Sequence, residues 1–251
     1  MAKARRPRKA SPKEAAAYAH SRRAEVAYAR KLRAVAVQII NIMGGFPPDH
    51  TSDIEDALRK YADLLMPWAR AVAMRMLTDV ARRDQRAWEM RASDIGRALK
   101  KEIAEAPTGV AMRELMQEQV ALITSLPLEA AQKVHAMVLG EMPQGTRPGD
   151  LEAGIKALGD ITKGRAKLIA RTEVARATTA LTQVRALSVG SVEYIWRSAH
   201  DARVRPDHEK LNGRVFRWDS PPIADSHSGV RAHAGAIYNC RCYPEPIIPD
   251  D

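Results

Sequence analysis

The sequence predicts a mainly α-helical protein, in which an N-terminal multi-helix region is followed by a small C-terminal α/β (α+β) module. Of its 251 residues, 45% are hydrophobic but only 5% are aromatic, which is typical of helices packed through aliphatic side chains. Apolar residues recur every three or four positions over most of the chain, as on one face of a helix. After Gly190 the composition changes, because residues 190–251 hold six of the twelve aromatic residues and both cysteines.

The first elements in order are a basic tail and a helix. Residues 1–13 contain six basic residues, two prolines and no acid, so we expect a disordered tail. Residues 14–43 are predicted to be helical, and the GGFPP segment at 44–48 is expected to end this helix. The helix carries an apolar stripe formed by Tyr28, Leu32, Val35, Ile39 and Ile42.

Two further stretches complete an α-helical region over residues 14–145. Ser52 and Glu55 fit a capping box that starts a helix continuing to about residue 91, with a kink or break at Pro67. Thr108 is a plausible cap for the next helix, and Pro127 then turns the chain into a shorter one.

The C-terminal module is predicted over residues 146–251, and a linker candidate, PQGTRPG at 143–149, overlaps its beginning. Asp150 is expected to cap a helix that Gly159 interrupts. A longer helix then continues until Gly190 stops it.

Two strands are predicted after that helix. Alternating apolar residues over 192–197 are typical of a strand. The Asn212-Gly213 pair is a hairpin-type turn, and it leads into a second strand over 214–218. The module therefore combines helix and sheet.

The charge of the protein is concentrated near its N-terminus. Residues 1–48 carry eleven Lys or Arg and two acidic residues, so nearly all of the net charge of +10 lies there. Such an arm can attract a polyanion, either nucleic-acid phosphates or an acidic protein face, although it could also be a solvated tail. No run approaches the eighteen apolar residues of a membrane span, so we expect a soluble protein. The basic residues of the tail are Lys3, Arg5, Arg6, Arg8, Lys9 and Lys13.

Cysteines and histidines of the C-terminal module could hold a structural Zn²⁺ ion. Cys240 and Cys242 are one residue apart, which is poor geometry for a disulfide between them. Thiolate and imidazole are ligands that Zn²⁺ prefers, and a closed structural site needs four. We select Cys240, Cys242, His208 and His233, with His227 as a substitute for either histidine. The alternative is that the cysteines are reduced and partly buried while the histidines form hydrogen bonds.

A catalytic interpretation would use a histidine of the module as a base. His200, His208 or His233 could act beside Asp201, with a metal, to hydrolyse phosphodiesters. The sequence contains no HExxH, Walker A loop or GxSxG motif, and a histidine near an aspartate is common in loops. We therefore expect a protein that is not an enzyme and keep a metal-dependent nuclease as the alternative.

Three segments resemble a known family in order and spacing. They are ARTEVARATTA at 170–180, DARVRPDHEKLNGRVF at 201–216 and HAGAIYNCRCYPEP at 233–246, with a Pro-Pro pair between the last two. Together they resemble the C-terminal domain of phage Mu protein F-like proteins, which are minor head or head-morphogenesis proteins of tailed bacteriophages. The resemblance covers under a third of the chain, and the N-terminal helices resemble the family only in being helical.

The resemblance implies a structural minor capsid protein, present in several copies per virion at the portal or in the capsid interior and made in the host cytoplasm. It implies the portal protein and capsid or coat proteins as partners, with packaged double-stranded DNA contacted without sequence preference and no membrane. We expect DNA at residues 1–13 and protein docking at the apolar stripe that begins at Tyr28. A packaging-associated nucleic-acid enzyme is the alternative.

The resemblance also assigns structural roles. Many relatives carry a Cys-x-x-Cys knuckle where this sequence has Arg205 and His208, so the metal site of the family is depleted here. Glu173 and the neighbouring arginines are expected to form ion pairs or hydrogen bonds against the 201–216 loop. The residues that match the family's motifs are Arg171, Thr172, Glu173, Arg176, Asp201, Arg203, Arg205, Asn212 and Gly213.

Overall fold

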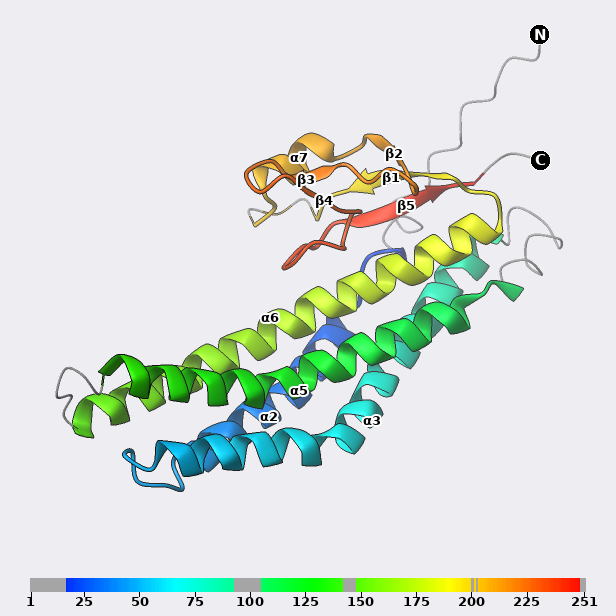
Figure 1. Ribbon diagram of the computed structural model, residues 1–251. Coiled ribbons are helices and arrows are strands. Elements are labelled where there is room, and N and C mark those ends of the chain that lie inside the picture. The colour runs from blue at the N-terminus through cyan, green and yellow to red at the C-terminus, as the bar shows by residue number, and fades with distance from the viewer. Residues whose placement is uncertain (1–16, 93–104, 142–147, 200, 202, 249–251) are drawn as a thin grey trace, which may run out of the picture. The chain divides into compact units, whose positions relative to one another are not determined.

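The computed structural model describes residues 17–92, 105–141, 148–199, 201 and 203–248. Long helices come first, and short strands together with the short helix α7 come last (Figure 1), which confirms the predicted fold class. None of the described helices contains an apolar stretch that could span a bilayer. The helices are α2 (Arg22–Met43), α3 (Thr51–Ala92), α5 (Thr108–Glu141), α6 (Pro148–Ser188) and α7 (Pro206–Leu211). The strands are β1 (Glu193–Arg197), β2 (Val215–Arg217), β3 (Ile223–Asp225), β4 (Val230–Arg231) and β5 (Tyr243–Ile247).

The chain forms two compact units, and each is described by itself. The helical unit consists of Glu25–Arg75 and Met116–Ala170. The mixed unit consists of Met1–Ala24, Met76–Leu115 and Arg171–Asp251. Because these units are groups of contacting residues and not consecutive stretches, the linear division into tail, helical region and module stays a prediction.

The helical unit has a core formed by the apolar faces of its four helical segments. On α2, Tyr28 is only 2% exposed and Leu32 and Ile39 are inaccessible to solvent. The Tyr28 hydroxyl donates a hydrogen bond of 2.9 Å to Oε1 of Gln119 on α5, so its polar group also has a buried partner. The predicted stripe is confirmed. It packs inside the unit, however, so the expectation that it docks on another protein was wrong.

Three residues that were expected to break or interrupt helices lie inside them. Pro67 lies within α3, Pro127 lies within α5, and α6 continues through Gly159. An interior proline removes one backbone hydrogen bond, but burial on both sides holds the helix, as at Leu126 and Ala130 beside Pro127. The breaks predicted at Pro127 and Gly159 were therefore wrong, and α3 does not end at Pro67.

Gly159 has a packing role. A Cβ atom at this position would lie 2.8 Å from Cγ1 of Ile40 on α2, which is closer than carbon atoms pack. The missing side chain therefore allows α6 and α2 to approach each other closely within the helical unit.

Helix α5 begins at Thr108, the residue predicted to cap it, but α2, α3 and α6 begin at residues other than those predicted. In α2, which begins at Arg22, the Ser21 hydroxyl accepts a hydrogen bond from the Ala24 backbone N–H, as an N-cap does. Helix α3 already begins at Thr51, so Ser52 lies in the first turn and not at the cap. Helix α6 begins at Pro148, a residue assigned to the linker, because proline fits the first turn of a helix.

The mixed unit contains a three-stranded antiparallel sheet with the order β2-β1-β5 and a separate pair, β3-β4. In the central strand β1, Tyr194 and Trp196 are completely buried while their neighbours are half-buried. This alternation confirms the predicted strand, since successive side chains of a strand point to opposite faces. The second strand is also confirmed, with Tyr194 opposite Phe216.

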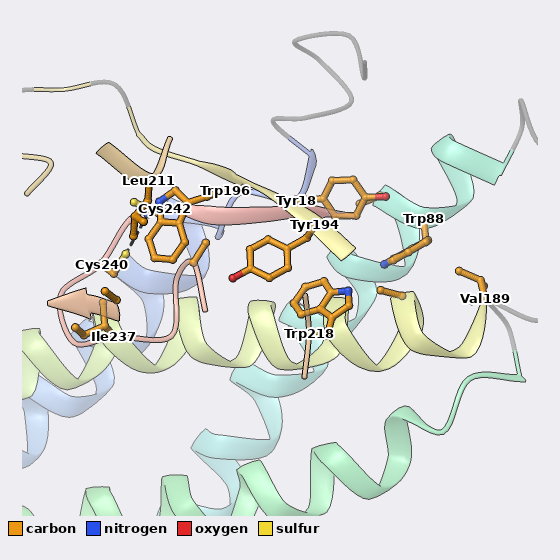
Figure 2. Packing of buried hydrophobic residues seen from close by; sticks show 14 residues of the cluster. Tyr18, Trp88, Val189, Tyr194, Trp196, Leu211, Trp218, Ile237, Cys240 and Cys242 are labelled. Atoms are coloured by element: carbon orange, nitrogen blue, oxygen red, sulfur yellow. Dashed lines mark hydrogen bonds between the residues drawn. The ribbon is translucent and has the colours of Figure 1, made fainter. Parts of the chain in front are cut away.

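Aromatic rings fill the core of the mixed unit (Figure 2). The rings of Tyr194 and Trp218 lie 4.4 Å apart, and Tyr18 meets the edge of Trp88 at 5.7 Å. Tyr18 comes from the segment before α2 and Trp88 from α3, so distant parts of the sequence share this core. The buried cluster consists of Tyr18, Ala87, Trp88, Ala186, Val189, Tyr194, Trp196, Leu211, Trp218, Ala224, Ala234, Ile237, Cys240 and Cys242.

Two glycines act as predicted at turns. Gly190 ends α6 with a φ of +74°, and Ser191 N–H donates to the Ala186 carbonyl at 2.9 Å, as in a Schellman motif. Gly213 has a φ of +78° in the predicted turn, where Asn212 Oδ1 accepts a hydrogen bond from the Ser198 N–H. The turn is not a simple hairpin, because α7 lies between β1 and this turn.

A buried ion pair joins α3 to α6 within the mixed unit. Asp84 Oδ2 accepts a hydrogen bond of 2.7 Å from Arg185 Nε, and Asp84 Oδ1 accepts one of 2.7 Å from the Thr182 hydroxyl. Burial raises the pKa of Asp84 to about 6, although Thr182 and Arg185 act in the opposite direction. Desolvation of the carboxylate therefore changes this pKa more than the hydrogen bonds and the charge of its partners do.

The close approach at Gly159 predicts opposite effects of two glycine substitutions in α6. Gly159→Ala should destabilise the protein by about 1–3 kcal/mol, because its methyl group would overlap Ile40. Gly164→Ala meets no atom within 4 Å and should stabilise the protein by about 0.5–1 kcal/mol through helix propensity. Urea unfolding measures both variants. Equal stabilities of the two variants would contradict the packing role.

Candidate metal centre

His208, Cys240 and Cys242 form a buried group in the mixed unit. One ligand atom from each lies within 4.8 Å of the others. Nδ1 of His208 is 3.5 Å from Sγ of Cys240 and 3.5 Å from Sγ of Cys242. Both cysteines are free and, like His208, only 2% exposed. The structure therefore brings together three of the four residues that the sequence selected.

Short elements position this group. His208 lies on α7, which begins at Pro206, and its ring meets the edge of Trp196 at 5.3 Å. The cysteines belong to the segment 233–242, here called the cysteine loop, which precedes β5 (Figure 2). Within it, the Cys242 N–H donates to Cys240 Sγ at 3.3 Å. Nε2 of His208 is buried without a hydrogen-bond partner in the described part of the chain, so packing orients the ring.

The two thiols differ in acidity. The hydrogen bond from the Cys242 side chain, assisted by His208, lowers the pKa of Cys240 to about 4 although burial acts in the opposite direction. The same hydrogen bond and burial raise the pKa of Cys242. Cys240 is therefore the first of the pair to become a thiolate, which is the form that binds metals.

The residues of this group fit Zn²⁺. Two thiolates and an imidazole are typical zinc donors. A nitrogen and a sulfur bound to one tetrahedral zinc at the usual bond lengths lie about 3.6 Å apart. The two N–S distances of 3.5 Å in this group match that spacing.

The remaining histidines lie elsewhere. Nδ1 of His233 is 3.1 Å from the Tyr194 hydroxyl, and its ring meets the edges of the Tyr194 and Trp218 rings. Burial lowers the pKa of His233, which favours a neutral ring in the aromatic core. His227 follows β3, and its backbone N–H donates to Asp225. His200 lies outside the described residues.

The segment 170–180, here called the α6 motif, contacts the cysteine loop. Arg171 Nη1 donates to Asn239 Oδ1 at 2.8 Å, and the Thr172 hydroxyl accepts a hydrogen bond from the Asn239 N–H at 3.0 Å. Glu173 is buried and lies 3.2 Å from Arg176 on the same helix. The partners of this motif were predicted in the 201–216 loop, but Asn239 lies beyond it.

The 201–216 loop has partners of its own in the cysteine loop. Both terminal nitrogens of Arg241 donate hydrogen bonds to the Asp201 carboxylate, one to each oxygen. These bonds, with help from the Arg203 N–H, lower the pKa of Asp201 to about 2. Arg205 donates to the Tyr238 carbonyl at 3.2 Å and stacks on the Tyr238 ring. Sequence reasoning missed Arg241, although its position between the two cysteines was a usable signal.

A glycine sets how closely the cysteine loop approaches the α6 motif. At Gly235, whose φ is +87°, a Cβ atom would lie 2.6 Å from Oγ1 of Thr179 and 2.9 Å from the carbonyl oxygen of Cys242. Beside it, the Thr179 hydroxyl donates to the Ala234 carbonyl at 2.7 Å. Only glycine leaves room for this contact.

Gly235→Ala should therefore destabilise the protein more than Gly229→Ala. Gly229 also has a positive φ, +70°, but no atom would lie within 4 Å of its Cβ. The control thus isolates the steric overlap at Gly235, which should add about 1–3 kcal/mol. Thermal unfolding compares the two variants. Equal losses of stability would show that the close approach at Gly235 does not contribute to the stability of the protein.

A family model matches the part of the chain that carries this centre. Residues 132–244 match the family model described as Phage Mu protein F like protein. An uncharacterized protein of Haemophilus influenzae is 36% identical over 132 residues, which are 53% of this chain but 28% of that relative. No solved structure matches the chain. Residues 132–244, which include the α6 motif, α7 and the cysteine loop, are therefore similar to the Phage Mu protein F like family.

Proposed function

We propose that the protein is a structural head-morphogenesis protein of a tailed bacteriophage, located in the virion at the portal or in the capsid interior. The observation that supports this most is the family match over residues 132–244, since the family is one of minor head proteins. The match covers most of the mixed unit's sheet region and its candidate metal centre. The contact of the basic tail with DNA and the contacts with portal, capsid or coat proteins are further parts of this proposal.

The geometry favours a structural role over the nuclease alternative. A histidine base beside Asp201 would need a free carboxylate oxygen to accept its N–H, but both Asp201 oxygens accept hydrogen bonds from Arg241. His208 faces two sulfur atoms inside the protein. Asp201 and His208 are therefore engaged in contacts between loops.

We further propose that His208, Cys240 and Cys242 hold a Zn²⁺ ion that stabilises the loops of the mixed unit. The strands that these loops connect are short, with two to five residues each. Metal binding by preformed ligands adds directly to folding free energy. The ion would tie α7 to the cysteine loop.

Metal analysis of the full chain, purified under reducing conditions, tests the zinc proposal. We expect about one Zn²⁺ per chain, lost in His208→Ala and Cys240→Ser and retained in the matched control His227→Gln. Removal of the metal by a chelator should lower the melting temperature, because the folded state alone binds it. Loss of zinc in His233→Gln, with its fold intact, would instead support the four-ligand set predicted from the sequence.

Quantitative mass spectrometry of purified virions tests the role in the head. We expect a low and fixed copy number relative to the portal and major coat proteins. Absence of the chain from mature particles would contradict a structural role in the virion and would favour a transient assembly factor or the nuclease. Nuclease assays of the wild type and His208→Ala would then separate these two.

The proposed DNA contact is tested by deleting residues 1–13, which lie outside the described residues. The six basic residues of this segment should give non-specific binding whose logarithm falls with the logarithm of salt concentration with a slope of up to about 5. Deletion should abolish this binding, and a variant with the order of residues 1–13 scrambled should retain it. Binding that is independent of salt or of this segment would refute the proposal.

A further inference from the structure

A small cavity lies directly beside the three candidate ligands. Its volume is about 40 Å³, which is enough for a water molecule or a small anion, since one water needs about 10–15 Å³. His208, Cys240 and Cys242 line it together with Arg203 and Arg205. The described protein atoms thus leave room next to the sulfur and nitrogen ligands.

Arg205 presents an unused hydrogen-bond donor in the wall of this cavity. Its Nη2 donates to the Tyr238 carbonyl, and its guanidinium lies 4.4 Å from the centre of the Tyr238 ring. Nη1 is buried and has no hydrogen-bond partner in the described part of the chain. A buried donor without a partner is costly, and Tyr238 already fixes the plane of this guanidinium.

The charges at the cavity favour an electron-rich ligand. A Zn²⁺ ion bound to two thiolates and a neutral imidazole has no net charge. The neighbouring Arg241 is paired with Asp201. Among the described residues, Arg205 forms no ion pair within 4.0 Å, and it acts on the Asp225 carboxylate only at longer range, where it helps to lower the pKa of Asp225. Arg205 therefore contributes a positive charge that an anion or the oxygen of a water molecule could face.

We propose that the metal has a fourth, open coordination position that faces this cavity, occupied by a water molecule that a small anion can replace, and that Arg205 donates a hydrogen bond to this ligand. This inference rests on the proposed zinc site. Structural zinc sites are closed by four protein ligands, whereas sites with three protein ligands leave a position for water or another small ligand. Arg205, which stands where relatives carry the first cysteine of the knuckle, would thus donate a hydrogen bond to the exchangeable ligand.

Cobalt substitution tests this inference, because Co²⁺ takes the place of Zn²⁺ and reports its coordination by visible absorption. The full chain is loaded with Co²⁺ and titrated with azide. We expect the spectrum to change with azide in a saturable way. Arg205→Gln should weaken azide binding by about tenfold, as expected for loss of a charged hydrogen bond, with less than about a twofold change in Co²⁺ affinity. Arg203→Gln, a matched control on the same cavity, should bind azide like the wild type.

The outcomes separate the two proposals. Failure to bind Co²⁺ or Zn²⁺ would overturn both. Binding of Co²⁺ with a spectrum that azide does not change would overturn the open position and leave the zinc site standing. A His200→Ala variant with an altered spectrum before azide is added would identify a fourth protein ligand and have the same consequence. Circular dichroism establishes that Arg205→Gln is folded, and Arg205→Lys provides a second variant that retains the charge but not the fork of donors.

Discussion

The close contact between the cysteine loop and α6 is the constraint on which the mixed unit depends. Gly235 allows the loop backbone to lie against Thr179, and the hydroxyls of Thr179 and Thr172 bond to the backbone of Ala234 and Asn239. These contacts fix the loop at both ends of the stretch before Cys240. Because interior packing tolerates little displacement, the register of this loop on α6 also decides where the two sulfur atoms lie.

The buried pair of Asp84 and Arg185 contributes to the specificity of packing more than to stability. Its members are 1% and 7% exposed as side chains, and burial raises the pKa of Asp84 despite the nearby arginine. Such a pair contributes little net stability, but an alternative packing that separated its members would leave a buried charge without a partner. We interpret it as a feature that selects one arrangement of α3 on α6 within the mixed unit.

The residues of the α6 motif and of the 201–216 loop are far apart in the sequence, but their contacts have a common target. Arg171 and Thr172 reach Asn239, Asp201 reaches Arg241, and Arg205 reaches Tyr238. The α6 motif and the 201–216 loop thus both contact the cysteine loop. Hydrogen bonds to charged groups are stronger than neutral ones, so arginines suit the task of holding irregular backbone. The same segment carries the two thiols of the candidate metal centre, so one short loop joins these structural contacts to that centre.

The sequence by itself determined the elements whose signals are local. Helical periodicity predicted the buried face of α2, alternation predicted β1, and Gly190 and Gly213 marked turns that need a positive φ. Only the tertiary structure decided that α5 continues through Pro127, that Gly159 is a packing contact and that His208, not His233, lies with the cysteines. These outcomes depend on which distant surface covers each residue. A proline, a glycine or a histidine has the same local preferences in either case, and packing between segments far apart in the chain supplies the deciding free energy.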